Sequence, residues 1–174
     1  MSKPIITFEA SVTSKATPQA IYNVLADPKT HLQWAGEQSP DKSFRLLDLD
    51  ADVGPLTTGS KFSSSGTSLG SQIFHDRSVV TEATAPSVLA FETASHLDRP
   101  HRPDWEAKFV HRYTVSSDGD GSRIDYICDV YPQNYRPFWL HPLFRPVMRM
   151  GVPRSITKNM ENLVRIAEAK KAAA

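Results

Sequence analysis

Apolar and polar side chains alternate in several separate segments between residues 4 and 132 of this chain, a pattern typical of β-strands with one buried face. The first such segment covers residues 4–14, and its apolar positions are Ile6, Phe8, Ala10 and Val12. Turn-forming Gly, Pro, Asp and Ser residues separate six further segments of the same kind. These predict strands at about 43–50, 59–68, 71–84, 87–97, 104–116 and 122–132.

The last two of these segments predict a hairpin, because Asp118–Ser122 between them reads Asp-Gly-Asp-Gly-Ser. On the apolar face of the earlier strand lie Trp105, Ala107, Phe109, His111, Tyr113 and Val115. On that of the later strand lie Ile124, Tyr126, Cys128 and Val130. Polar residues fill most of the opposite face, so we expect an antiparallel sheet with one face in water.

Two short helices are predicted between the first and second strands. Thr17-Pro18 and Asp27-Pro28 each combine an N-cap residue with a proline at the first helical position, where its missing N–H costs nothing. The first helix should bury Ile21, Val24 and Leu25, and the second runs toward Trp34.

Near the C-terminus the hydrophobic period changes to three and four residues. Ile156, Met160, Leu163 and Ala167 follow this spacing, which predicts an amphipathic helix over about 154–170. Prolines interrupt the segment before it, so we expect any helix there to be broken or kinked. These are Pro137, Pro142, Pro146 and Pro153.

This order of elements predicts an α+β fold, in which a seven-stranded twisted antiparallel sheet curls around the long C-terminal helix. We expect one domain over residues 1–174, with a regular core at about 4–170. The chain has 174 residues, 40% of them hydrophobic, which is enough for a core and argues against disorder.

Charge and cysteine content exclude several classes of protein. The net charge of +1 gives little attraction for nucleic acid, so we expect no nucleic-acid partner. A single cysteine, Cys128, excludes a disulfide framework and a four-cysteine zinc site. No run of 18 apolar residues occurs, and Glu9 interrupts any signal-peptide core. We therefore expect a cytoplasmic protein.

Basic residues are concentrated in the C-terminal part, since residues 135–174 carry a net charge of +6 and residues 1–134 a net charge of −5. Aromatic and aliphatic residues interleave with arginines over 135–153. This segment either forms the lid and upper core of the domain, or presents a basic aromatic patch that touches anionic lipid transiently.

Two motifs are interpreted as turns. Gly66–Gly70 matches G-x-S-x-G, but a nucleophile elbow needs a buried parallel strand before it and a helix after it, and neither is predicted. Asp118–Ser122 resembles the start of a calcium loop, but Arg123 stands where that loop requires glycine.

Several potential metal ligands lie close together in sequence, namely His96, Asp98, His101 and Asp104. Two imidazoles and a carboxylate could hold a divalent ion. Arg99 and Arg102 raise the electrostatic cost of such an ion, and the segment lacks regular strand or helix spacing. We therefore expect solvated loop charges, no metal site and no cofactor.

His111 is the most interesting histidine, because it falls on the apolar face of its strand with Tyr113, Tyr126 and Cys128 as predicted neighbours. A buried imidazole needs a hydrogen-bonding partner, which is either one of these tyrosines, the backbone or a ligand. Cys128 is interpreted as a core residue rather than a nucleophile, because nothing nearby in sequence would stabilise its thiolate.

Several segments together resemble one known superfamily. They are Thr17-Pro18 with Asp27-Pro28 and Trp34, Val79–Ala83 with Pro86 and Leu89–Phe91, Gly121–Ile124, and Pro142–Pro146 before the terminal helix. Over residues 5–170 the chain resembles the START-like superfamily, in particular bacterial polyketide cyclase/dehydrase-type proteins of the SRPBCC group. The resemblance implies a helix-grip fold, like that of the birch pollen allergen, with an elongated apolar cavity between sheet and terminal helix.

The resemblance implies a protein that binds a small hydrophobic or amphipathic molecule, such as a lipid or a polyketide-like or aromatic compound. We expect Trp34 near the entrance and the walls to include Phe91, Phe109, His111, Tyr113, Tyr126, Val152, Ile156 and Met160. Two alternatives stay open. One is an aromatase/cyclase-type enzyme in which His111 or a tyrosine moves protons. The other is a protein-interaction module.

Overall fold

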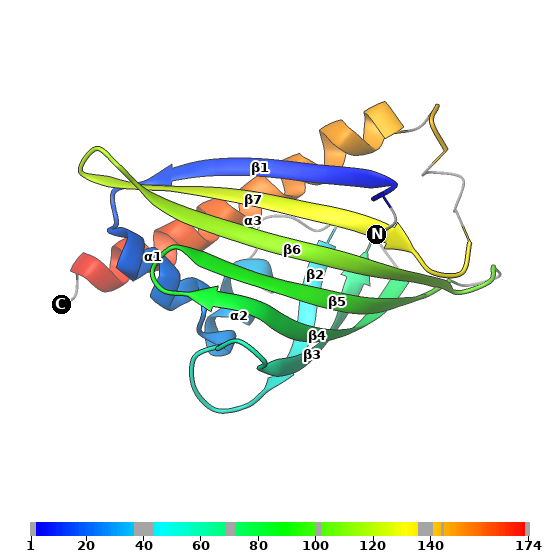
Figure 1. Ribbon diagram of the computed structural model, residues 1–174, viewed down its shortest axis with the longest axis horizontal. Coiled ribbons are helices and arrows are strands. Elements are labelled where there is room, and N and C mark those ends of the chain that lie inside the picture. Colours follow the sequence, from blue (N-terminus) through cyan, green and yellow to red (C-terminus); the bar gives the residue numbers. More distant parts are fainter. Residues whose placement is uncertain are drawn as a thin grey trace.

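A single curved antiparallel sheet forms most of the molecule (Figure 1). The computed structural model describes residues 3–36, 44–68, 72–99, 102–135, 141–143 and 145–172. Its seven strands have the order β1-β7-β6-β5-β4-β3-β2. They are β1 (Ile6–Ser14), β2 (Phe44–Ala51), β3 (Lys61–Ser68), β4 (Gln72–Thr84), β5 (Val88–Asp98), β6 (Trp105–Asp118) and β7 (Gly121–Pro132).

The α+β fold and the seven predicted strands are confirmed, with ends that shift by only a few residues. The β6–β7 hairpin is confirmed as well, since Asp118 pairs with Gly121. Its turn places Gly119 at a φ of 56°, a left-handed conformation that glycine adopts without steric cost. Gly66, Thr67 and Ser68 of the G-x-S-x-G match lie in β3 rather than in a turn, and the rest of the match lies outside the described residues.

Helices α1 (Pro18–Leu25) and α2 (Pro28–Ala35) begin where their capping residues predict. The Thr17 side chain accepts a hydrogen bond from the Ala20 backbone N–H, and the Asp27 carboxylate accepts one from that of Lys29. These bonds satisfy backbone donors that have no partner within the helix. Both helices pack beside the C-terminal half of α3 (Figure 1).

Helix α3 (Arg145–Ala172) runs along one face of the sheet (Figure 1). The prediction that the regular helix starts only at about 154 is wrong. Pro146 occupies the second position of the helix, where a backbone N–H needs no helical partner. Pro153 lies inside the helix and removes one hydrogen bond without ending it.

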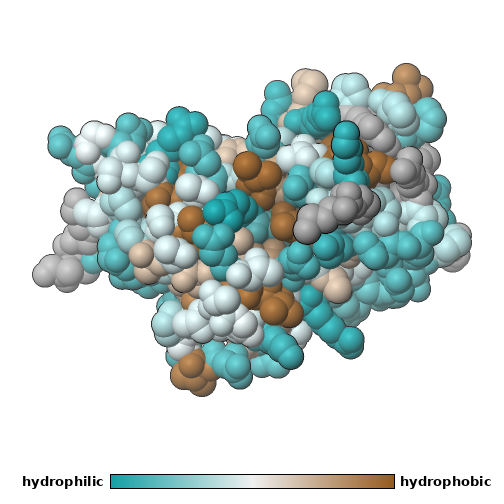
Figure 2. All heavy atoms as spheres, viewed as in Figure 1, coloured by the Kyte–Doolittle hydropathy of each residue, from teal (hydrophilic) through white to brown (hydrophobic). Residues whose placement is uncertain are grey.

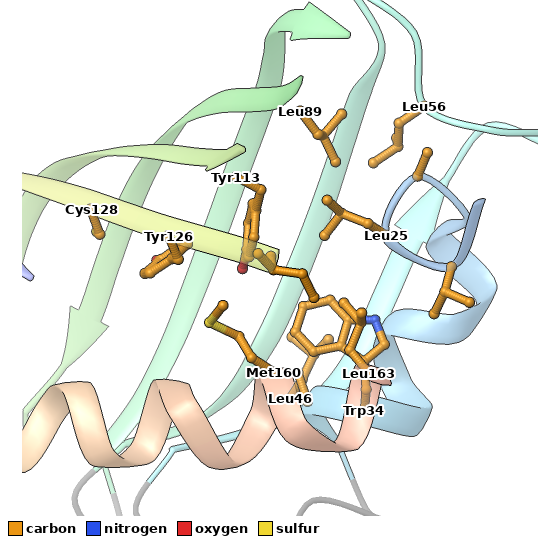
Figure 3. Close-up of a cluster of buried hydrophobic side chains, with 14 of the residues drawn as sticks. Leu25, Trp34, Leu46, Leu56, Leu89, Tyr113, Tyr126, Cys128, Met160 and Leu163 are labelled. Atoms are coloured by element: carbon orange, nitrogen blue, oxygen red, sulfur yellow. The ribbon is translucent and has the colours of Figure 1, made fainter. Parts of the chain in front are cut away.

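The main core lies between the sheet and the C-terminal half of α3. Met160 and Leu163 point from α3 toward the strands, with Tyr113 and Tyr126 facing them from the sheet (Figure 3). Leu163 is completely buried and Met160 is 1% exposed. Asn162 holds α2 in place, because its side-chain amide donates to the Gln33 backbone carbonyl at 3.0 Å.

Candidate ligand-binding site

Cross-strand pairing brings the predicted aromatic residues together on the inner face of the sheet. Phe91 of β5 pairs with His111 of β6, and Thr93 pairs with Phe109 one step further along. The Phe91 and His111 rings stack with centroids 4.6 Å apart, and the Phe109 ring lies 6.0 Å from the imidazole. The result is a continuous aromatic surface with the His111 imidazole at its centre.

Tyr126 is the hydrogen-bonding partner of His111. The His111 Nδ1 atom and the Tyr126 hydroxyl are 2.7 Å apart, as expected for a buried imidazole that needs a partner. Burial lowers the pKa of His111 to about 4, so the imidazole is neutral at physiological pH. Among the described residues the other ring nitrogen, Nε2, has no hydrogen-bonding partner.

The neighbouring titratable groups are also held in their neutral forms. Burial raises the pKa of the Tyr126 hydroxyl well above its ordinary value, and it raises that of Tyr113 in the same way. Burial likewise raises the pKa of the Cys128 thiol to about 12, although a hydrogen bond with Tyr126 opposes the shift. Cys128 is therefore a buried neutral thiol, as the sequence predicts. This part of the inner face favours uncharged ligand groups.

The nine predicted site residues divide into two groups by burial. The packed end comprises the residues that the protein itself covers, which are Trp34, Tyr113, Tyr126 and Met160 together with Leu163. The open end comprises inward-facing residues that stay incompletely covered, which are Phe91, Phe109, His111, Val152 and Ile156. Beyond Phe109 on β6, the inward-facing residues Ala107 and Trp105 are buried again. Trp34 is only 6% exposed and packs near Leu163, so it does not border an entrance as predicted (Figure 3).

A carboxylate that the sequence interpretation missed lies on the same inner face. Asp76 of β4 pairs with Ser64 on one side and with Ser95 on the other. Burial raises its pKa to about 6, against the opposing effects of a hydrogen bond from Ser95 and of nearby His75. Its Oδ1 atom is buried and has no hydrogen-bonding partner. The sequence pattern could have identified this residue, because Asp76 is an even number of positions from the buried residues Phe74 and Val80 and therefore projects from the same face of β4.

Two surface hollows are formed by the described residues. One, of about 630 Å³, is bordered by α1, the segment before β3 and the β4–β5 turn. The other, of about 720 Å³, is lined by Asp76 and Ser95 as well as by His75, His96 and Glu106. Neither lining contains any of the nine predicted residues. The evidence for the open end is therefore the inward placement and partial exposure of its side chains.

The prediction that the potential metal ligands lie in an irregular loop is partly wrong. His96 and Asp98 lie in β5, where they have regular strand spacing, and Asp104 directly precedes β6. His101 lies outside the described residues.

The apolar residues on the surface do not form one large patch in the view of Figure 2, where hydrophobic side chains occur in small separate groups among hydrophilic ones. Part of the predicted basic aromatic segment, residues 136–140 and 144, lies outside the described residues. In the described part, Leu143, Val147 and Met150 are 75%, 67% and 60% exposed. No described helix is both long and apolar enough to cross a membrane.

A curved seven-stranded sheet, two short helices after its first strand and a long C-terminal helix define the helix-grip class of fold. Within that class, the chain belongs to the polyketide cyclase/dehydrase and lipid transport family, whose sequence profile matches residues 6–168. The predicted family and fold are thus confirmed. The family assignment supports a coarse function, the binding of hydrophobic small molecules.

Solved structures with the same fold have little sequence in common with this chain. An uncharacterized protein from Rhizobium leguminosarum is 12% identical, with a TM-score of 0.65 and coverage of 94% of this chain and 95% of the other. A conserved protein from Geobacillus kaustophilus is 9% identical, with a TM-score of 0.70 and coverage of 94% and 96%. Ara h 8.0201 is 10% identical, with a TM-score of 0.63 and coverage of 94% and 98%. The search of curated proteins found no match.

Proposed function

We propose that the protein binds a small amphipathic molecule between the inner face of the sheet and the N-terminal half of α3, at the open end. The observation that carries this proposal is that Phe91, Phe109 and Ile156 face inward yet stay partly uncovered. Burying about 400 Å² of ligand there at about 25 cal/mol per Å² gives about 10 kcal/mol before the costs of association. Micromolar affinity is the expected result.

The polar groups give the site a direction. With the Tyr126 hydroxyl donating to Nδ1 of His111, the Nε2–H faces the ligand and can donate to a ligand carbonyl or hydroxyl oxygen. Asp76 lies in the inner-face row two steps along the strands from the row of His111. Four residues of strand span about 13 Å. We therefore propose an elongated ligand with an oxygen acceptor near His111 and a hydrogen-bond donor near Asp76.

Binding is tested first by native mass spectrometry of the full chain as purified, to identify small molecules that remain bound. A fluorescence titration then uses cis-parinaric acid, whose carboxyl group offers an acceptor, and 1,8-ANS as a second probe. We expect saturable binding that weakens at least fivefold in a Phe91→Ser variant with an unchanged circular dichroism spectrum. A matched outer-face variant, Ile127→Ser, should bind like the wild type, because Ile127 is 41% exposed and points away from the site. Equal binding by both variants would contradict the proposal.

Asp76 also supports a second candidate function, the proton transfer of a cyclase-type enzyme. An acid with a pKa near 6 exchanges protons readily at physiological pH, and a buried carboxyl with one unpartnered oxygen can meet a substrate directly. This reassigns the predicted proton-transfer role from His111, whose pKa of about 4 makes it a weak base. An Asp76→Asn variant that binds a poly-β-keto substrate but no longer turns it over would support the enzyme. Wild-type protein that binds such a substrate without any turnover would contradict it.

The exposed residues at the start of α3 support a transient contact with anionic membranes during ligand exchange. Val147 and Met150 are uncovered, and Arg149 and Arg154 lie on the same stretch of helix. Apolar and cationic side chains together favour an anionic lipid surface. Cosedimentation should be greater with phosphatidylglycerol vesicles than with phosphatidylcholine vesicles and should fall in a Val147→Ser/Met150→Ser variant. Equal sedimentation with both vesicles would contradict this contact.

A further inference from the structure

Three neighbouring strands bring a cluster of histidines and carboxylates together on the outer face of the sheet. His75 of β4 pairs directly with His96 of β5, and His96 pairs with Glu106 of β6. Asp98 lies two residues beyond His96 on the same face of β5, and Asp104 approaches from the segment before β6. All five side chains project from the face opposite to the open end.

The distances within the cluster are close to the spacing of ligands around a small metal ion. Nε2 of His96 lies 3.1 Å from Asp98 Oδ1 and 3.6 Å from Asp104 Oδ2. Zinc bonds to nitrogen and oxygen are about 2.0–2.2 Å long, so neighbouring ligand atoms of a tetrahedral site lie about 3.3–3.6 Å apart. One ligand atom from each of these three residues lies within 4.8 Å of the other two.

A candidate fourth ligand and an orienting group lie next to these three residues. Nε2 of His75 lies 3.4 Å from Asp98 Oδ2, close enough for a side-chain rotation to bring it to an ion held by Asp98. Oε1 of Glu106 lies 3.7 Å from Nδ1 of His96. Metal-binding histidines commonly direct their second nitrogen to a carboxylate, which fixes the tautomer that presents the other nitrogen to the metal.

The side chain of Arg99 pairs with a residue outside the cluster, and its backbone helps to orient one of the carboxylates. Its guanidinium donates to the Tyr135 hydroxyl at 2.6 Å. Its backbone N–H donates to Asp104 Oδ1 at 3.1 Å, which orients this carboxylate with Oδ2 toward His96. The Arg99 side chain thus pairs with Tyr135, and the three carboxylates supply negative charge around the two imidazoles.

We propose that His75, His96, Asp98 and Asp104 form a binding site for one Zn²⁺ ion, with Glu106 orienting His96. The mixture of imidazole nitrogens and carboxylate oxygens suits zinc. The ion ties β4 and β5 to the segment that leads into β6, at the opposite face of the sheet from the ligand site. This inference is independent of the proposed function.

The test is calorimetric titration of zinc into the full chain after removal of its affinity tag and of bound metal by a chelator. We expect one site with a dissociation constant in the micromolar range or below. Asp98→Asn and His96→Gln should each weaken binding at least tenfold. Asp125→Asn is the matched control, because this carboxylate is similarly exposed on β7 and pairs with Arg123 instead. It should leave binding unchanged.

Cobalt provides a second, spectroscopic readout. Co²⁺ bound in a tetrahedral site of nitrogen and oxygen ligands absorbs visible light far more strongly than octahedral Co²⁺, so the wild type should show these bands and the Asp98 variant should lose them. An absence of zinc binding, or binding that survives both Asp98→Asn and His96→Gln, would overturn the proposal. In either case the cluster would be a network of ion pairs only.

Discussion

The two ends of the space between the sheet and α3 differ in how completely the protein fills them. At the packed end, Leu163 is fully buried and Met160 is 1% exposed, and α1 and α2 close the space around them. At the open end, Val152 and Ile156 of the same helix stay only partly covered, as do the aromatic residues that face them. One helix thus stabilises the fold with its C-terminal half and offers a binding surface with its N-terminal half.

Buried polar groups occur in both parts of this space, and at the packed end the Nε1 atom of Trp34 has no hydrogen-bonding partner among the described residues. At the packed end, the Asn162 amide donates to backbone carbonyls of α2. On the inner face beyond it, Oδ1 of Asp76 is buried and has no hydrogen-bonding partner among the described residues. A buried polar atom without a partner destabilises a fold, and a ligand that donates a hydrogen bond to Oδ1 of Asp76 would remove this cost.

The largest expected effect is on the free energy of unfolding when one apolar side chain is truncated at each end. Leu163→Ala removes a fully buried side chain and should lower the free energy of unfolding by about 3 kcal/mol. Ile156→Ala at the open end should lower it by about 1 kcal/mol, because little packing is lost there. Urea denaturation of the ligand-free variants measures both. Equal losses would show that the two ends are packed alike.

The next effect concerns Asp76. Burial raises the pKa of this carboxyl from 3.8 to about 6, so the folded state binds the proton more tightly than the unfolded state. The resulting stabilisation is complete below about pH 3.8 and is lost as the pH rises through about 6. Asp76→Asn should therefore stabilise the protein by about 2 kcal/mol at pH 8 and have little effect near pH 3.5.

Denaturation of this variant across the pH range checks the sign, with Asp125→Asn as the exposed control. His111 contributes in the opposite direction, since its pKa falls from 6.5 to about 4. Its contribution is present above pH 6.5 and is lost as the pH falls through about 4. If Asp76→Asn stabilised the protein equally at pH 3.5 and pH 8, the Asp76 carboxyl would not be a buried group with a raised pKa.

A smaller difference in stability is expected between variants of the two buried tyrosines, Tyr126 and Tyr113. Tyr126→Phe removes the hydroxyl that pairs with Nδ1 of His111 and should cost about 1 kcal/mol of stability. Tyr113→Phe is the matched control, because Tyr113 is equally buried and makes ring contacts but no side-chain hydrogen bond with the described residues. Its effect should be only a few tenths of a kcal/mol, and urea denaturation at pH 7 resolves the difference. The reverse order would contradict the His111–Tyr126 pairing.

The smallest effect is in local dynamics along α3. Backbone amides at 147–152 should exchange with deuterium faster than those at 159–167. Residues 147–152 lie on a more exposed part of the helix, and Pro153, which cannot donate a helical hydrogen bond, directly follows them. A bound ligand should slow exchange at 147–152 and leave 159–167 nearly unchanged. Uniform protection of both groups, with or without ligand, would rule out opening at this end.

The sequence predicted local structure well, because strands, caps and turns depend on nearby residues. Alternation located the seven strands, and Thr17 and Asp27 located the starts of two helices. The start of α3 was missed because the rule that proline interrupts a helix was applied to Pro146 and Pro153 alike, although only Pro153 lies in the helix interior.

The candidate site could be predicted only where it depends on a short hairpin. His111 and Tyr126 follow from the β6–β7 register, which the Asp118–Ser122 turn determines. The position of Asp76 beside Ser95, and of His75 beside His96, depends on the pairing of β4 with β5. A local sequence pattern does not identify such cross-strand neighbours by itself, and it does not tell which inward-facing residues stay uncovered.

The most direct test of the open end as the ligand site is photocrosslinking with a fatty acid that carries a diazirine group, followed by mapping of the labelled residues by mass spectrometry. The account predicts labels on β5, β6 and the 152–156 segment of α3, which an excess of unlabelled fatty acid competes away. Labels that are confined to the exposed residues Leu143, Val147 and Met150, or that resist competition, would contradict it.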